Sequence, residues 1–100
     1  MTMWEVLIPV ADNDGVAFTR EHHEAWYGIV VGMVGGMTIM PDVEGYWKHD
    51  EKLYHETMRP VRIVTDNEYT VRALVGIAKG FYRQLSILYY KVSDEATFYE

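Results

Sequence analysis

Cysteine is absent from this chain of 100 residues, and basic residues are scarce. Without cysteine the protein cannot form a disulfide, use a thiolate, or hold zinc through sulfur ligands. Its 9 basic residues stand against 15 acidic ones, for a formal net charge of −6. Nucleic-acid binders carry the opposite charge on their binding face. The composition therefore indicates a domain held together by packing, with no nucleic-acid partner.

Long apolar runs are missing as well. The longest uncharged stretch, residues 25–41, has 17 residues and contains Gly35, Gly36 and Pro41. A membrane-spanning helix needs about 20 predominantly apolar residues. The start of the chain, residues 1–5, lacks the basic and apolar segments of a secretory signal. We therefore expect a soluble, cytoplasmic protein with no membrane partner.

What the chain does have is apolar material for one core. Apolar residues make up 49% of it and aromatic residues 14%. A chain of this length is typical of one domain. We expect a single α+β domain over residues 1–92, followed by an acidic C-terminal tail over residues 93–100.

The hydrophobic periodicity changes along the chain between the strand period and the helix period. Thr19 is expected to cap the first helix, and Thr65, with Glu68 three residues later, the second. Pro60 cannot donate to a β-ladder, so an edge, a bulge or a break is expected there. In chain order the predicted elements are a strand at 3–10, a helix after Thr19, strands at 37–40, 43–47 and 53–64, a helix after Thr65 and a strand at 85–92.

This order predicts a ferredoxin-like βαββαβ fold, an antiparallel sheet with two helices on one face. The other face of the sheet cannot be strongly polar. The first strand carries Met3 and Leu7 on the face opposite Trp4, and the last strand has apolar or aromatic residues on both faces. An apolar sheet face without helices needs a partner. We therefore expect a homo-oligomer that assembles through the open sheet face.

Aromatic residues gather on the predicted hairpin, where Trp47 and Tyr54 lie near His55 and Arg59. Rings with a few polar groups suit a small-molecule pocket. The same residue types dominate protein interfaces, and the interface interpretation is favoured because catalytic spacings are absent. Trp47, Tyr54, His55 and Arg59 are the candidate ligand contacts of this segment.

The four histidines have no spacing typical of a metal site. His22 and His23 are adjacent on a helix and point in different directions. His49 and His55 flank the hairpin turn and could face each other, but surface positions explain them better. We expect no metal and no cofactor.

Several short motifs follow one another: Gly36-x-Thr38, Gly45-x-Trp47, a strand opening at Arg59, and Gln84-x-Ser86-Ile87. With these motifs, residues 5–92 resemble a family of small bacterial proteins of unknown function with a ferredoxin-like α+β fold. The chain departs from the family pattern by one extra residue between the first two motifs and by Leu85, where the family tends to be acidic. The resemblance implies no activity. It marks positions to test, which are Thr38, Trp47, Arg59, Gln84 and Ser86, and it adds Gln84 to the candidate ligand contacts.

Two functions stay open. The first is a homo-oligomeric module that binds a small molecule or a protein partner, including a regulatory sensor by fold analogy. The alternative is a small dimeric α/β-barrel enzyme acting on an aromatic or carbonyl compound, with His55 as base and Arg59 as anion anchor. A pocket holding a histidine of shifted pKa would favour the enzyme.

Overall fold

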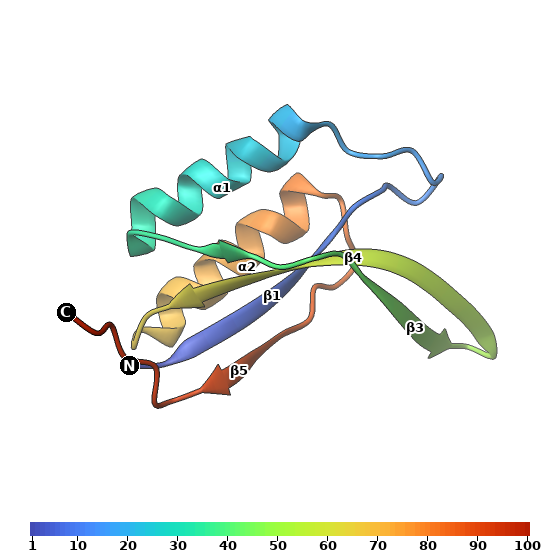
Figure 1. The fold of residues 1–100 in the computed structure, drawn as a ribbon. Coiled ribbons are helices and arrows are strands. Elements are labelled where there is room, and N and C mark those ends of the chain that lie inside the picture. Colours follow the sequence, from blue (N-terminus) through green and yellow to red (C-terminus); the bar gives the residue numbers. More distant parts are fainter.

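Alternating apolar residues place β1 (Met3–Pro9) in the middle of a five-stranded antiparallel sheet. The computed structural model describes residues 1–100. Both helices lie on one face of this sheet (Figure 1), so the predicted ferredoxin-like α+β fold is confirmed. The strand order is β2-β4-β1-β5, and β3 pairs with the outer part of β4. The other elements are α1 (Arg20–Val34), β2 (Thr38–Ile39), β3 (Val43–His49), β4 (Lys52–Val64), α2 (Glu68–Phe81) and β5 (Tyr89–Ser93).

The core lies between the sheet and the two helices. Every second residue of β1 faces it, and β4 continues the pattern because Val61 pairs with Val6 and Ile63 with Trp4. The helices close the core with fully or almost fully buried side chains, among them Trp26, Val30, Val71, Leu74, Ala78 and Tyr82. Burial of one such large apolar side chain contributes about 1.5–3 kcal/mol. No helix is long and apolar enough to cross a membrane.

The helix ends follow the capping rules, with one correction to the expectation. Thr19 caps α1, and its hydroxyl oxygen accepts from the His22 amide at 3.1 Å. The α2 cap is Asn67, whose Oδ1 accepts from the amides of Tyr69 and Thr70 at 3.0 and 3.3 Å. The predicted Thr65 cap was wrong because Asn67, a stronger N-cap type than Thr, stands two residues closer to the helix.

A 13-residue strand, β4, carries the hairpin beyond the helix-covered part of the sheet (Figure 1). Two strands pair with this side of β4, with a gap between them beside Pro60. The pairing with β2 ends at Val61, and the pairing with β3 begins at Met58. β4 itself runs through Pro60, which pairs with Leu7 in regular register, so the break or bulge expected in this strand is not found. The gap lies instead in the strands that face β4, at the position where proline has no amide hydrogen to donate. The hairpin turn holds Asp50 and Glu51, both with positive φ, as in the turns that match strand twist.

The last strand begins later than predicted. β5 starts at Tyr89 instead of residue 85, and Leu85 is 95% exposed. Arg83 adopts a left-handed conformation, with φ 54°, where the chain leaves α2. The next residues cross from the helix layer to the sheet, so regular pairing begins only where the chain reaches β1.

Candidate functional site

One face of the sheet has no helix over it (Figure 1). The residues on this uncovered face alternate with the core residues along each strand. On β1 they are Met3, Glu5 and Leu7, and on β5 they include Tyr90 and Val92. Tyr90 and Val92 are about two-fifths exposed, at 40% and 39%. Exposed apolar side chains in a contiguous group mark interaction sites.

A charged centre lies in the middle of the uncovered face. Glu5, on the central strand, pairs with Arg62 of β4 on one side and Tyr90 of β5 on the other. Arg62 Nε donates to Glu5 Oε1 at 2.8 Å, and the Tyr90 hydroxyl donates to Glu5 Oε2. The two neighbours cover the carboxylate so well that Glu5 is only 7% exposed. The Glu5 carboxylate on this face is therefore shielded from water and hydrogen-bonded by its two strand neighbours, although no helix covers it.

The hairpin brings two of the predicted ligand contacts together. Trp47 and Tyr54 are directly paired across β3 and β4, so their side chains share one face. The Trp47 indole Nε1 would lie 3.1 Å from a Cβ at position 45, and the tip of Met58 would collide with it. Gly45 therefore leaves room for the Met58 methyl group and the Trp47 indole beside the strand, and a larger residue there would displace the end of the Met58 side chain.

His55 lies on the opposite face of the hairpin. It pairs with Tyr46, and the two rings stack with centroids 4.4 Å apart and an interplanar angle of 1°. His55 Nε2 lies 3.3 Å from Glu44 Oε1. His55 therefore does not share a pocket with Trp47 and Tyr54.

Arg59, on β4, links the connection between β2 and β3 to α1. Its Nε donates to Asp42 Oδ1 at 2.8 Å, and its Nη1 donates to the Tyr27 hydroxyl of α1 at 3.2 Å. These hydrogen bonds, the one with Asp42 first, raise the pKa of Arg59. Gln84 lies elsewhere, after α2, where its Nε2 donates to the Tyr82 carbonyl at 3.0 Å. The structure thus brings Trp47 and Tyr54 together and leaves the other three candidates apart.

The two hairpin histidines do not face each other, and both side chains lie at the surface, the interpretation that the sequence favoured. His49 pairs with Lys52, whereas His55 pairs with Tyr46. The two-residue turn at Asp50 and Glu51 sets this register, which separates the histidines by three cross-strand pairs. No group of three or more His, Cys, Asp or Glu side chains is arranged to hold a metal ion.

A buried polar pair, missed by sequence reasoning, joins the helices. His23 Nδ1 and the Tyr82 hydroxyl are 2.7 Å apart, and both residues are buried. Burial lowers the pKa of His23 and raises the pKa of Tyr82. The available signal was position, because His23 shares the buried stripe of α1 with Trp26 and Val30. Glu5 could have been noticed in a similar way, because it is the one acidic residue in an otherwise apolar strand.

Among solved structures, CutA proteins have the same class of fold as this chain, with two helices on an antiparallel sheet. The periplasmic divalent cation tolerance protein CutA of Archaeoglobus fulgidus matches with a TM-score of 0.68 and 10% identity, over 97% of this chain and 86% of that one. CutA1 of Oryza sativa matches with a TM-score of 0.68 and 14% identity, over 97% and 82%.

A third solved structure belongs to an enzyme. A phage SAM lyase in complex with S-methyl-5′-thioadenosine matches with a TM-score of 0.64 and 14% identity, over 99% of this chain and 92% of that one. At these identities the matches show a shared fold. No protein-family model matches the sequence, and no curated protein does so. The fold implied by the sequence resemblance is confirmed, and membership of the bacterial family stays a hypothesis.

Proposed function

We propose that the protein is a homo-oligomeric binding module whose copies pack through the uncovered sheet face and the β3–β4 hairpin. The observation that carries the proposal is the Glu5 carboxylate, buried on a face with no helix over it. It lies between the partly exposed Met3 and Leu7 on its own strand and beside the exposed Tyr90. A second copy would cover these side chains and leave the carboxylate paired with Arg62.

The hairpin supports the same proposal. An isolated two-stranded hairpin is at best marginally stable in water. This one exposes apolar or aromatic side chains on both faces, with Trp47 and Tyr54 on one and Tyr46 and Leu53 on the other. Tyr and Trp are enriched where partners bind. A hairpin that packs on a neighbouring copy would bury both faces.

The ligand part of the proposal concentrates on Trp47 and Tyr54, because these two rings are adjacent and about two-fifths exposed, each at 39%. His55 and Arg59 are already paired with Glu44 and Asp42. We therefore expect them, and Gln84, to contribute less to a ligand site. The name of the Archaeoglobus fulgidus protein mentions divalent cations, but this chain has no group of three or more His, Cys, Asp or Glu side chains that could hold one.

A second candidate function is the binding of a nucleoside such as S-methyl-5′-thioadenosine. The observation that favours it is the extent of the SAM lyase match, which covers a larger share of both chains than either CutA match above. The barrel-enzyme alternative has less support. The sheet is open, and Arg59 is held by Asp42 and Tyr27 instead of being available to bind an anion.

Native mass spectrometry, with and without S-methyl-5′-thioadenosine, tests both candidates. We expect an oligomer at micromolar concentration, and Trp47→Ala should shift it toward the monomer. Leu85→Ala is the matched control, because Leu85 is 95% exposed but lies outside the uncovered face and the hairpin. A wild-type monomer, or equal loss of assembly in both variants, would contradict the proposal. An added nucleoside mass would support the second candidate.

A further inference from the structure

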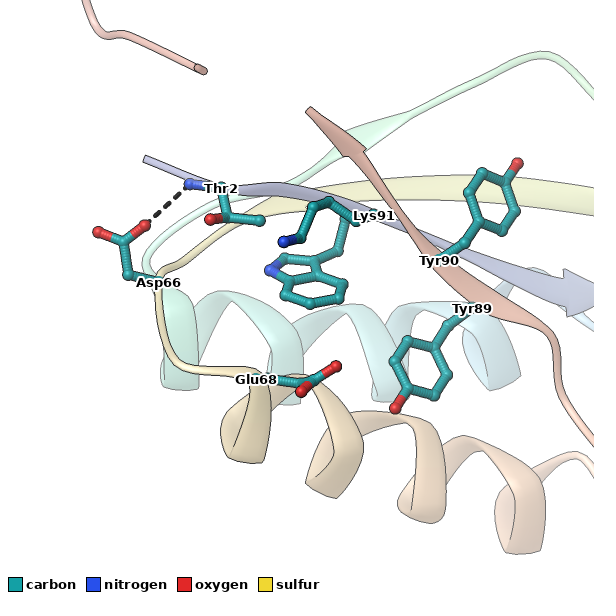
Figure 2. A pocket seen from close by; sticks show the side chains of 7 residues that line it. Thr2, Asp66, Glu68, Tyr89, Tyr90 and Lys91 are labelled. Carbon is teal, nitrogen blue, oxygen red and sulfur yellow. Dashed lines mark hydrogen bonds between the residues drawn. The ribbon is translucent and has the colours of Figure 1, made fainter. Parts of the chain in front are cut away.

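A hollow of about 520 Å³ lies at the edge of the sheet, between β5 and the beginning of α2 (Figure 2). It is on the helix-covered side of the sheet and is separate from the Trp47 hairpin. The residues around it come from the beginning of the chain, from α2 and from β5: Thr2, Trp4, Asp66, Glu68, Tyr89, Tyr90 and Lys91. Its volume lies within the range of small-molecule pockets.

The apolar wall of the hollow is aromatic and held in place. Trp4 is 6% exposed, and its indole Nε1 donates to the Thr65 carbonyl at 2.9 Å. The Tyr89 ring lies 6.3 Å from it at an interplanar angle of 45°. Figure 2 shows Tyr89 extending toward α2, whereas Tyr90 points away from it. Trp4 therefore forms the fixed base of the hollow, and the partly exposed Tyr89 ring is the aromatic surface beside it.

Opposite charges stand around this wall. The Lys91 ammonium lies 5.7 Å from the centre of the Trp4 ring, within reach of a cation–π contact. The Glu68 carboxylate projects from the first residue of α2 (Figure 2). Lys91 and Glu68 are exposed, and neither takes part in an ion pair in the structure. A cation and an anion thus flank one aromatic wall without neutralising each other.

A second carboxylate adds to the negative side. Asp66 Oδ1 accepts from the Thr2 amide at 2.9 Å, which fixes the Asp66 side chain beside the hollow. The arrangement matches a compact molecule that has an ammonium group, a carboxylate and an apolar part. We infer that the hollow binds a free α-amino acid with an apolar side chain. Its carboxylate meets Lys91, its ammonium group meets Glu68 and Asp66, and its side chain packs on Trp4 and Tyr89.

Isotope-edited NMR titration with L-phenylalanine tests this inference. The indole N–H signal of Trp4 should shift on binding, and that of Trp47 on the hairpin should not. Two analogues separate the charges: 3-phenylpropionate lacks the ammonium group, and phenethylamine lacks the carboxylate. Each should bind about tenfold more weakly than L-phenylalanine, because a charge-assisted contact is lost. Equal binding of phenethylamine, or a shift confined to Trp47, would overturn the inference.

Two substitutions assign the contacts. Lys91→Met should weaken L-phenylalanine binding about tenfold and leave phenethylamine binding unchanged, because phenethylamine has no carboxylate. Glu68→Gln should also weaken L-phenylalanine binding about tenfold, but it should leave 3-phenylpropionate binding unchanged, because that analogue has no ammonium group. Lys79→Met and Glu21→Gln are matched controls, since Lys79 is an exposed lysine outside the hollow and Glu21 is the acid in the first turn of α1. Wild-type binding in Lys91→Met would contradict the inference.

The inference does not depend on the proposed assembly, since every residue of the hollow comes from one chain. Native mass spectrometry of the same variants keeps the two apart. Oligomers that do not bind L-phenylalanine would refute the amino-acid site and leave the assembly standing. Monomers that bind L-phenylalanine would refute the assembly and leave the amino-acid site standing.

Discussion

Replacement of Glu5 by Gln tests the charged centre of the uncovered face. A hydrogen bond to a charged group contributes about 1.5–3 kcal/mol, and Glu5 accepts two, from Arg62 and Tyr90. Both partners can recover water in one chain, because the Arg62 side chain is 35% exposed and Tyr90 is 40% exposed. Gln also keeps an acceptor. We therefore expect the free energy of unfolding of the monomer to fall by about 1.5–3 kcal/mol.

The effect on assembly should be larger. When a second copy covers the face, Arg62 can no longer be hydrated, and a buried charge left without its partner costs about 3–5 kcal/mol. Urea denaturation measures the effect on folding, and sedimentation equilibrium measures the effect on association. Glu24→Gln is the control, since Glu24 makes a similar contact with Arg20 at 2.9 Å on the open surface. If Glu5→Gln is as mild as this control in both assays, the reasoning fails.

Two further predictions concern the buried pair between the helices. Tyr82→Phe leaves the His23 ring without its hydrogen-bond partner, so the free energy of unfolding, measured by urea denaturation, should fall by about 1–3 kcal/mol. Tyr69→Phe is the control, because Tyr69 is 82% exposed, and it should change the free energy of unfolding little. Because burial lowers the pKa of His23, the unfolded chain takes up its proton first as the pH falls below about 6.5. Stability should therefore decrease from pH 7 to pH 5 with a contribution of up to about 1.4 kcal/mol per pH unit, and His23→Gln should remove that contribution. An unchanged pH slope in His23→Gln would show that the histidine is not the group responsible.

Much of the fold could be predicted from local patterns. Alternation in residues 3–10 identified the strand that the structure places at the centre of the sheet, and Thr19 marked the beginning of the first helix. Pro60 signalled an irregularity, but the sequence placed it in the strand that contains Pro60, whereas the gap lies in the strands that face β4. Boundaries that depend on a partner were predicted less well, as the late start of β5 shows.

In the candidate site, too, some features could be predicted from the sequence and others could not. Trp47 and Tyr54 were chosen as aromatic residues of one hairpin, and the register pairs them. The sequence could not show that His55 faces the other way, because one residue of slip in the turn exchanges the two faces of a strand. Neither could the sequence pair Arg59 of β4 with Asp42 and Tyr27, because Asp42 lies in the loop before β3 and Tyr27 lies on α1.

The sequence by itself determined the class of fold and the burial of one strip of β1. These properties follow from residue type and period, which are local. Only the tertiary structure decided that Glu5 would meet Arg62 and Tyr90. It also decided that Trp4, Glu68 and Lys91 would surround one hollow. These groups lie far apart in the chain, and their meeting depends on strand order and register, which are set by the packing of the whole domain.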